Sequence, residues 1–158
     1  MIRQIQYFIA SLVLLCVPTQ AVAGVVVFDD LNFGEFIVKN NAAMHSITVN
    51  LSGPAYTFDS AGFILINDAA IQSGRYRITG LAPSMAVASV VVTQITPLSG
   101  ASGPSFQMSA FQVSHPASTN GAGNLNNVRL GATAQTSGAG TAYVDQTYNG
   151  TLQIQINF

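Results

Sequence analysis

The stretch that most constrains the fold is the last one in the chain, residues 150–158, in which apolar and polar residues alternate up to the C-terminus. Side chains on a β-strand point to opposite faces with a period of two residues. A helix would spread the same apolar residues around its circumference, so the pattern predicts a half-buried strand. Its apolar face consists of Leu152, Ile154, Ile156 and Phe158.

Full burial of these four side chains would contribute roughly 6–12 kcal/mol, which is an upper bound. A terminal strand with that much apolar surface is expected to need a partner strand on each side. The partners could come from the same chain or from another chain.

The N-terminal segment 1–23 has the pattern of a secretory signal peptide. Arg3 precedes an apolar run over residues 7–17, and the small residues Ala21 and Ala23 form a cleavage pattern. The apolar run is too short to span a membrane. We therefore expect Sec-type export to the periplasm, the cell surface or the extracellular medium.

Residues 24–158 are expected to form one domain. The lone cysteine, Cys16, lies in the signal segment, so the exported chain has no disulfide, thiol nucleophile or thiolate metal site. Its four cationic and six acidic side chains give a net charge of 4 − 6 = −2. No basic patch is evident along the sequence, which argues against nucleic acid and anionic membrane surfaces as partners.

Short β-rich runs alternate with clusters of Gly, Ser, Asn and Pro after residue 23, and no run has a helical period. This spacing predicts an antiparallel all-β sandwich or barrel. The expected strands cover residues 25–28, 31–38, 45–51, 62–67, 75–80, 86–96, 106–113, 128–134 and 152–158.

Three local details accompany these strands. The alternation slips at Gly34, which predicts a bulge or a close backbone approach. The short run 62–67 is expected to be buried on both faces. Asn149-Gly150 is either a hairpin turn or a kink in one long final strand, and the local pattern favours the hairpin.

The sequence contains no recognisable set of catalytic residues. His45 and His115 have no acidic residue at ligand spacing and are expected at the surface. Asp29 and Asp30 are neighbours on a strand, point to opposite faces and are expected as solvated edge charges. The glycine-rich stretches are followed by no helix that could bind phosphate. The sequence therefore predicts no enzyme, no cofactor and no metal site.

Four phrases, in this order and spacing, resemble a bacterial secreted domain family of unknown function that is related to spore coat protein U and to chaperone–usher fimbrial subunits. The phrases are Leu31-Asn32-Phe33-Gly34, Arg77-Ile78-Thr79-Gly80, the run at 128–133 and the run at 148–158. The resemblance covers residues 31–158. It implies an immunoglobulin-like, pilin-like sandwich in a Gram-negative periplasm, incomplete until a strand from another protein is added at a sheet edge.

The resemblance also implies a site and partners. The partner-strand groove would be lined by Tyr148, Gly150, Leu152, Ile154, Ile156 and Phe158. The candidate donor segment is Val25, Val26, Val27 and Phe28. The partners would be other pilin-like subunits or a periplasmic chaperone. Because the donor segment is short and does not alternate, either the subunit ends a fibre or the domain is complete by itself.

We therefore expect an exported fimbrial or pilin-like subunit with a structural or adhesive role, assembled by β-strand complementation. The first alternative is a self-complete secreted β-sandwich that binds a ligand such as a carbohydrate. The second is a small outer-membrane β-barrel, since a final strand ending in Phe158 also suits such proteins. Short, uneven strands and the lack of Trp argue against that second alternative.

Overall fold

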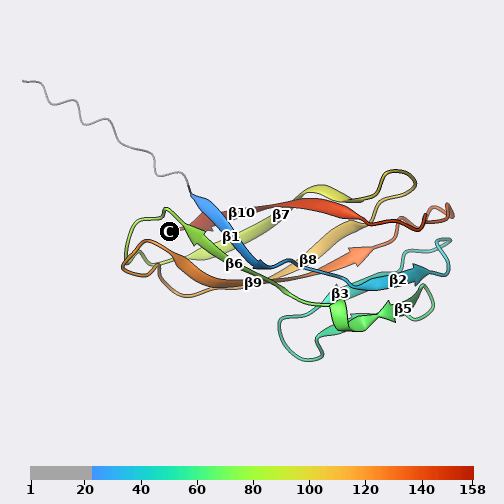
Figure 1. Cartoon of the computed structure of the whole chain (residues 1–158), viewed down its shortest axis with the longest axis horizontal. Helices are drawn as coiled ribbons and strands as arrows, with labels where there is room; N and C mark the ends of the chain where they lie inside the picture. The colour runs from blue at the N-terminus through green and yellow to red at the C-terminus, as the bar shows by residue number, and fades with distance from the viewer. Residues whose placement is uncertain (1–22) are drawn as a thin grey trace, which may run out of the picture.

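The computed structural model describes residues 23–158, so the predicted signal peptide falls almost wholly outside the described residues (Figure 1). The described chain consists of ten strands and one short 3₁₀ turn, η1 (Asp68–Ala70). The strands are β1 (Gly24–Asp29), β2 (Glu35–Val38), β3 (Ser46–Val49), β4 (Tyr56–Phe58), β5 (Phe63–Asn67), β6 (Gly74–Thr79), β7 (Ser89–Ser99), β8 (Gln107–Ser114), β9 (Leu125–Gln135) and β10 (Asn149–Asn157).

Strand β9 is the centre of a six-stranded antiparallel sheet. One edge of β9 pairs with β8. The other edge pairs with β6 near the start of β9 and with β3 near its end. Strand β1 extends the sheet beyond β6, and β4 extends it beyond β3.

Two small antiparallel sheets cover the inner face of this larger sheet. Strands β7 and β10 pair with each other, as do β2 and β5. In Figure 1, β7 and β10 run side by side toward the end that holds the C-terminus, and β2 and β5 lie at the opposite end. The predicted antiparallel β-sandwich is confirmed.

The core is divided between these two ends. One cluster joins the inward residues Tyr76, Ile78, Val128 and Leu130 of β6 and β9 to Val90 and Val92 of β7. The other joins Ile47, Val49, Ala132 and Ala134 of β3 and β9 to Phe63 of β5 and to Phe106. Strand β9 contributes to both clusters because its even-numbered inward residues run the length of the sandwich.

The slip in alternation at Gly34 is a close backbone approach, as predicted. Gly34 has a φ of +80°, and a Cβ there would lie 2.5 Å from Cγ1 of Ile71 and 2.9 Å from the Asn67 carbonyl oxygen. Only glycine combines a left-handed backbone with that space. Gly34 thus lets the segment before β2 pack directly on the η1 region.

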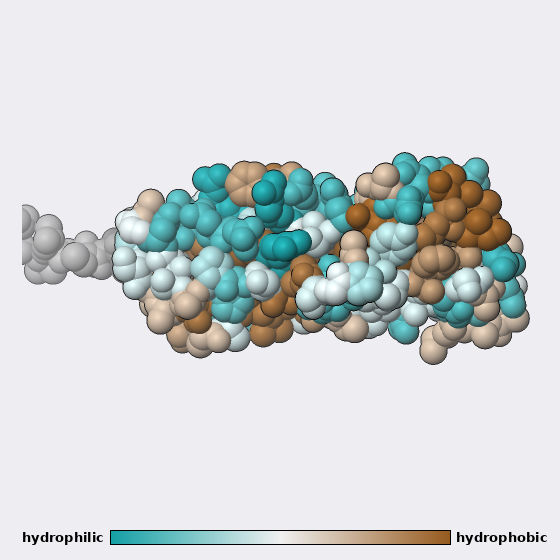
Figure 2. Space-filling view, turned by 90° about the horizontal axis from the view of Figure 1, so that it is seen from below, coloured by the Kyte–Doolittle hydropathy of each residue, from teal (hydrophilic) through white to brown (hydrophobic). Residues whose placement is uncertain are grey.

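Two local expectations were wrong. Strand β5 is not buried on both faces: Ile64 and Ile66 are exposed, because the β2–β5 sheet is covered on one face only. Figure 2 shows hydrophobic surface gathered at this end of the molecule. Asn149-Gly150 is not a hairpin turn, because β10 begins at Asn149 and pairs with β7, far away in the sequence.

Among residues 23–158, no helix has the length and hydrophobicity that crossing a lipid bilayer would require.

Candidate functional site: an apolar groove beside the last strand

Strand β10 is an edge strand. Its register against β7 places Ile154 opposite Val92 and Ile156 opposite Val90. Within the described residues, no strand pairs with the second edge of β10. An open edge of this kind presents backbone N–H and C=O groups that another strand can bind.

The inner face of β10 is only partly covered. Leu152, Ile154 and Ile156 contact the core, and each remains half-buried. Phe158 follows them with half of its side chain exposed. The alternation predicted for this strand is present, but its apolar face lacks the full burial that a central strand would have.

Strand β1 lies across from this edge and is also uncovered. Its register places Val25 opposite Ile78 and Val27 opposite Tyr76, so these pairs share the inner face of the sheet. Ile78 and Tyr76 are buried, whereas Val25 is 54% exposed and Val27 is 50% exposed. The β7–β10 layer therefore covers β6 but stops short of β1.

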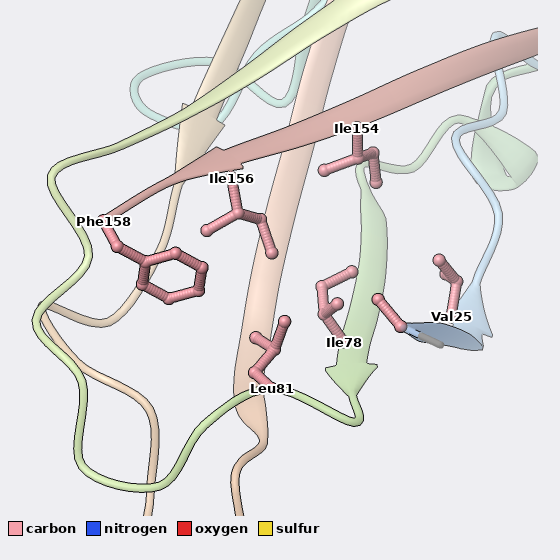
Figure 3. Close-up of a pocket in the computed structure, with 7 residues that line it drawn as sticks. Val25, Ile78, Leu81, Ile154, Ile156 and Phe158 are labelled. Atoms are coloured by element: carbon pink, nitrogen blue, oxygen red, sulfur yellow. The ribbon is translucent and has the colours of Figure 1, made fainter. Parts of the chain in front are cut away.

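The space between β10 and the β1–β6 pair is an apolar groove of about 260 Å³. In Figure 3, the side chains of β10 point toward those of β1, β6 and the segment after β6. The lining residues are Ala23, Val25, Ile78, Leu81, Ile154, Ile156 and Phe158. No lining side chain carries a charge or a hydrogen-bonding group, so the groove suits an apolar occupant.

The structure places four of the residues predicted for the site on this groove, namely Val25, Ile154, Ile156 and Phe158. Leu152 lies nearer the start of β10, outside the groove, where it packs against both core clusters.

Tyr148 and Gly150 lie beyond the end of the groove. The Tyr148 hydroxyl donates to the Val144 carbonyl oxygen at 2.9 Å, and its ring packs edge-on against Phe106. Gly150 sits close to β7, where a Cβ would lie 3.0 Å from the Thr96 carbonyl oxygen.

The remaining residues of the candidate donor segment are held in β1, which pairs with β6 of the same chain. Val26 lies opposite Arg77 on the outer face of the sheet. Phe28 lies at a register shift in β1 and stacks against two arginines of β6.

Sequence reasoning missed Ala23, Ile78 and Leu81 as groove residues. Alternation along its strand gives Ile78 the same face as Tyr76, and both residues are buried. No local pattern tells which distant strand that face meets. Leu81 follows the strand directly and carries no signal of its own.

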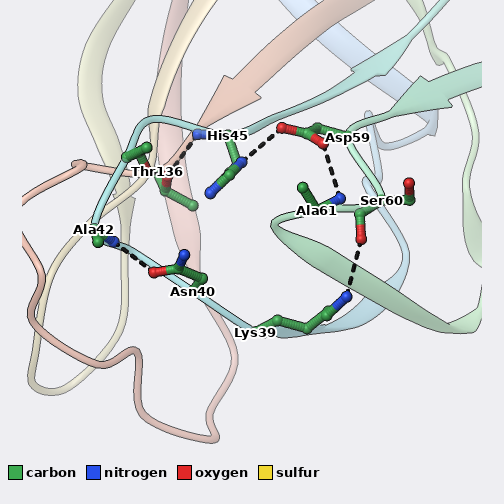
Figure 4. A network of polar contacts seen from close by, with 9 residues as sticks. Lys39, Asn40, Ala42, His45, Asp59, Ser60, Ala61 and Thr136 are labelled. Atoms are coloured by element: carbon green, nitrogen blue, oxygen red, sulfur yellow. Dashed lines mark hydrogen bonds and ion pairs between the residues drawn. The ribbon is translucent and has the colours of Figure 1, made fainter.

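A second feature, a polar network, lies around His45 at the other end of the molecule (Figure 4). The expectation of a surface position was wrong, because His45 is 9% exposed and its Nδ1 lies 2.6 Å from Oδ2 of Asp59. The Asp59 carboxylate also accepts a hydrogen bond from the backbone N–H of Ala61. These hydrogen bonds, first that of His45, lower the pKa of Asp59 below its ordinary value.

The His45–Asp59 pair connects β3 to the turn before β5. The backbone N–H groups of Gly62 and Phe63 donate to the Asp59 carbonyl oxygen at 3.1 and 3.0 Å. The histidine Nε2 is buried and has no partner among the described residues. The backbone N–H of His45 donates to the Thr136 hydroxyl at 2.9 Å, so hydrogen bonds tie His45 both to Asp59 and to the segment that follows β9.

Comparison with known proteins identifies a family. Residues 25–158 match the family described as a domain of unknown function (DUF4402). No curated protein and no solved structure matches the chain. Because the match spans the whole sandwich and both walls of the groove, the chain belongs to this DUF4402 family.

Proposed function

We propose that this protein is an exported, pilin-like surface subunit with a structural or adhesive role, assembled by β-strand complementation. The observation that carries the proposal is the strip of uncovered apolar surface between β10 and β1. Val25 and Val27 lie on the inner face of the larger sheet and are still half exposed, and the facing edge of β10 has no partner among the described residues. The sandwich thus has the shape of a fold that lacks one strand.

A guest strand beside β10 would supply a backbone partner for its free edge and would also cover the exposed apolar side chains of β1. Its backbone would bind the free edge of β10 and extend the β7–β10 sheet. Its alternate side chains would enter the groove and cover Val25 and Val27. Each apolar side chain buried in this way contributes up to about 1.5–3 kcal/mol, so a few such residues would give a stable complex.

The guest strand would come from another pilin-like subunit or from a periplasmic chaperone. The chain's own candidate donor, Val25–Phe28, forms one wall of the groove through its pairing with β6. A copy that donated this segment would lose the wall of its own groove. We therefore assign the acceptor role to the subunit as folded here, and a donor role only to a copy in which β1 has left β6.

A self-complete secreted binding module is the second candidate. The observation that favours it is the pairing of β1 within its own chain, which gives the larger sheet all six strands without a partner. In that case, the groove would take a small apolar ligand or stay empty.

A peptide-binding experiment distinguishes the two candidates. The exported protein is examined by size-exclusion chromatography and thermal melting, with and without a peptide that copies residues 24–31. The matched control is the same peptide with Val26→Asp and Val27→Asp, which places a carboxylate on each face of the strand.

If the groove accepts strands, the copied peptide binds and raises the melting temperature, and the control peptide does neither. A monomer that melts cooperatively at the same temperature with both peptides would contradict strand complementation by this segment and support the self-complete module.

A further inference from the structure

Three of the four cationic side chains after residue 23 meet on the outer face of the larger sheet. Arg75 and Arg77 are on β6, and Arg129 is on β9 directly opposite Arg75. Like charges that face each other across a ladder destabilise a sheet. Most of the cations of this charge-poor chain therefore lie where they repel one another and lower its stability. Residues placed against stability in this way are typical of functional sites.

Phe28 organises two of these arginines. The guanidinium carbon of Arg75 lies 5.5 Å from the centre of the Phe28 ring, and that of Arg77 lies 5.0 Å from it. Both guanidinium groups are thus within cation–π distance of the ring, whose face attracts them electrostatically.

Asp29 compensates the charge at the Arg75 end of this cluster, because its Oδ2 accepts a hydrogen bond from Nε of Arg75 at 2.8 Å. Arg129 donates to the hydroxyl of Ser73 at 2.9 Å. In the described part of the protein, the guanidinium of Arg77 has no ion pair or hydrogen bond, and its Nε is buried without a partner.

Neutral hydrogen-bonding side chains surround the uncompensated end. Ser114 of β8 lies directly opposite Arg129. Asn126 and Asn127 are exposed at the shift in register where β9 passes Arg77, and Asn127 has a left-handed φ of 56°. The extra residue of such a bulge turns side chains toward the outer face. The guanidinium groups of Arg77 and Arg129 are thus bordered by these two amides and the Ser114 hydroxyl on the outer face of the sheet.

We propose that this outer face binds an anionic polysaccharide. Guanidinium groups bind carboxylate and sulfate oxygens in bidentate fashion, and Arg77 and Arg129 provide the two forks for the acidic groups of the sugar chain. Ser114, Asn126 and Asn127 provide partners for its hydroxyl groups. Phe28 supplies an apolar edge at the side of β1.

The charge of the protein favours a polysaccharide over a nucleic acid. The whole chain has a formal net charge of −1, and the arginine cluster spans only two neighbouring strands. A nucleic acid carries one charge for every phosphate and needs a longer basic track. A polysaccharide whose acidic groups alternate with hydroxyl-rich sugars matches a short cluster of arginines set among amides.

The site is independent of the groove. Arg77 and Ile78 are adjacent on β6, so their side chains lie on opposite faces of the sheet. A strand in the groove and a sugar chain on the arginine face could bind together. The outcome of the peptide experiment therefore does not affect this proposal.

The test measures binding of the exported protein to four immobilised polymers: dextran sulfate, polygalacturonate, uncharged dextran and single-stranded DNA. The site variant is Arg77→Gln with Arg129→Gln. The matched control is Lys39→Gln, which removes a cation far from this face, where Lys39 Nζ donates to the Ser60 carbonyl oxygen. Circular dichroism verifies that both variants keep their strands.

We expect binding to at least one acidic polymer and none to dextran, with an affinity that falls as salt rises. The double variant should lose about tenfold or more in affinity, and Lys39→Gln should stay within about twofold because surface charges far from a ligand are screened. Dextran sulfate and polygalacturonate separate sulfate from carboxylate recognition.

Unchanged affinity in the folded double variant, binding to neither acidic polymer, or equal binding to dextran would overturn the proposal. If the double variant fails to fold, Ser114→Lys provides a second test, because added positive charge at the site should strengthen binding. Tighter binding to single-stranded DNA than to either acidic polymer would overturn the polysaccharide assignment.

Discussion

The two ends of the sandwich differ in how far the larger sheet is covered. At the β2–β5 end, Phe63 and Phe106 are buried, and Tyr143 stacks on Phe106 with ring centres 4.2 Å apart. At the β7–β10 end, Ile154 and Ile156 are half-buried, and Val25 is mostly exposed. The same chain thus builds a closed core and an open groove, so the groove is a local property and does not reflect a poor supply of apolar residues.

The largest effect should come from the closed end. Phe63→Ala removes a buried ring that packs edge-on against Phe36 at 5.0 Å. We expect a loss of about 3–5 kcal/mol in the free energy of unfolding, since the cavity cannot collapse fully. Ile64→Ala, the exposed neighbour, should cost less than about 1 kcal/mol. Urea unfolding of both variants checks this, and equal losses would show that the closed end is loosely packed.

Close packing at Gly34 gives the next largest effect. Gly34→Ala adds a Cβ to a left-handed residue in contact with Ile71, and we expect a loss of about 2–4 kcal/mol. Gly53 has a similar φ of +76°, but a Cβ there would meet nothing within 4 Å, so Gly53→Ala should cost about 1 kcal/mol. Thermal unfolding of the two variants compares their losses of stability. A Gly34→Ala protein as stable as Gly53→Ala would show that the Ile71 contact gives way easily.

The open end should respond in binding more than in stability. Ile154→Asp places a carboxylate in the groove, where water still reaches it in the free protein. We expect a loss of about 1–2 kcal/mol in stability, because the half-buried Ile154 packs against the core. The strand-peptide affinity should fall about a hundredfold, because the bound state would bury the charge. Gln155→Asp adds the same charge to the outer face of β10 and should bind normally. Titration calorimetry compares the two variants, and normal binding and export of Ile154→Asp would argue against the groove as the binding site.

The smallest effect concerns Asp59. Because its pKa is lowered in the folded protein, its ionised form adds stability above its unfolded pKa, and this is lost as pH falls through the lowered folded value. Asp59→Asn should therefore be less stable than the native protein near neutral pH, and the difference should shrink in acid. Asp145→Asn, at an exposed carboxylate, should show no such trend. Chemical unfolding across the acid range tests this, and a constant difference for Asp59→Asn would contradict it.

Much of the local structure could be predicted. The inward positions of Ile47, Val49 and Ile78 follow from the alternation of their strands, and all three are buried. The apolar alternation also changes parity between Met108 and Phe111, and the structure has an irregularity there: Ala110 has a left-handed φ of 48°, and the register against β9 shifts. The exposure of Ile64 and Ile66 could not be predicted, because an apolar run has the same sequence whether one or two layers cover it.

The alternation of residues 152–158 by itself determined a strand with one apolar face, because the direction of side chains along a strand depends only on neighbouring residues. Only the tertiary structure decided that this strand pairs with β7 alone among residues 23–158, that His45 meets Asp59, and that Arg75 lies opposite Arg129. The sequence shows no basic patch, since its arginines are few and Arg129 is far from the other two along the chain. Contacts of this kind depend on which strands pair and in what register, and many long-range interactions together settle that choice.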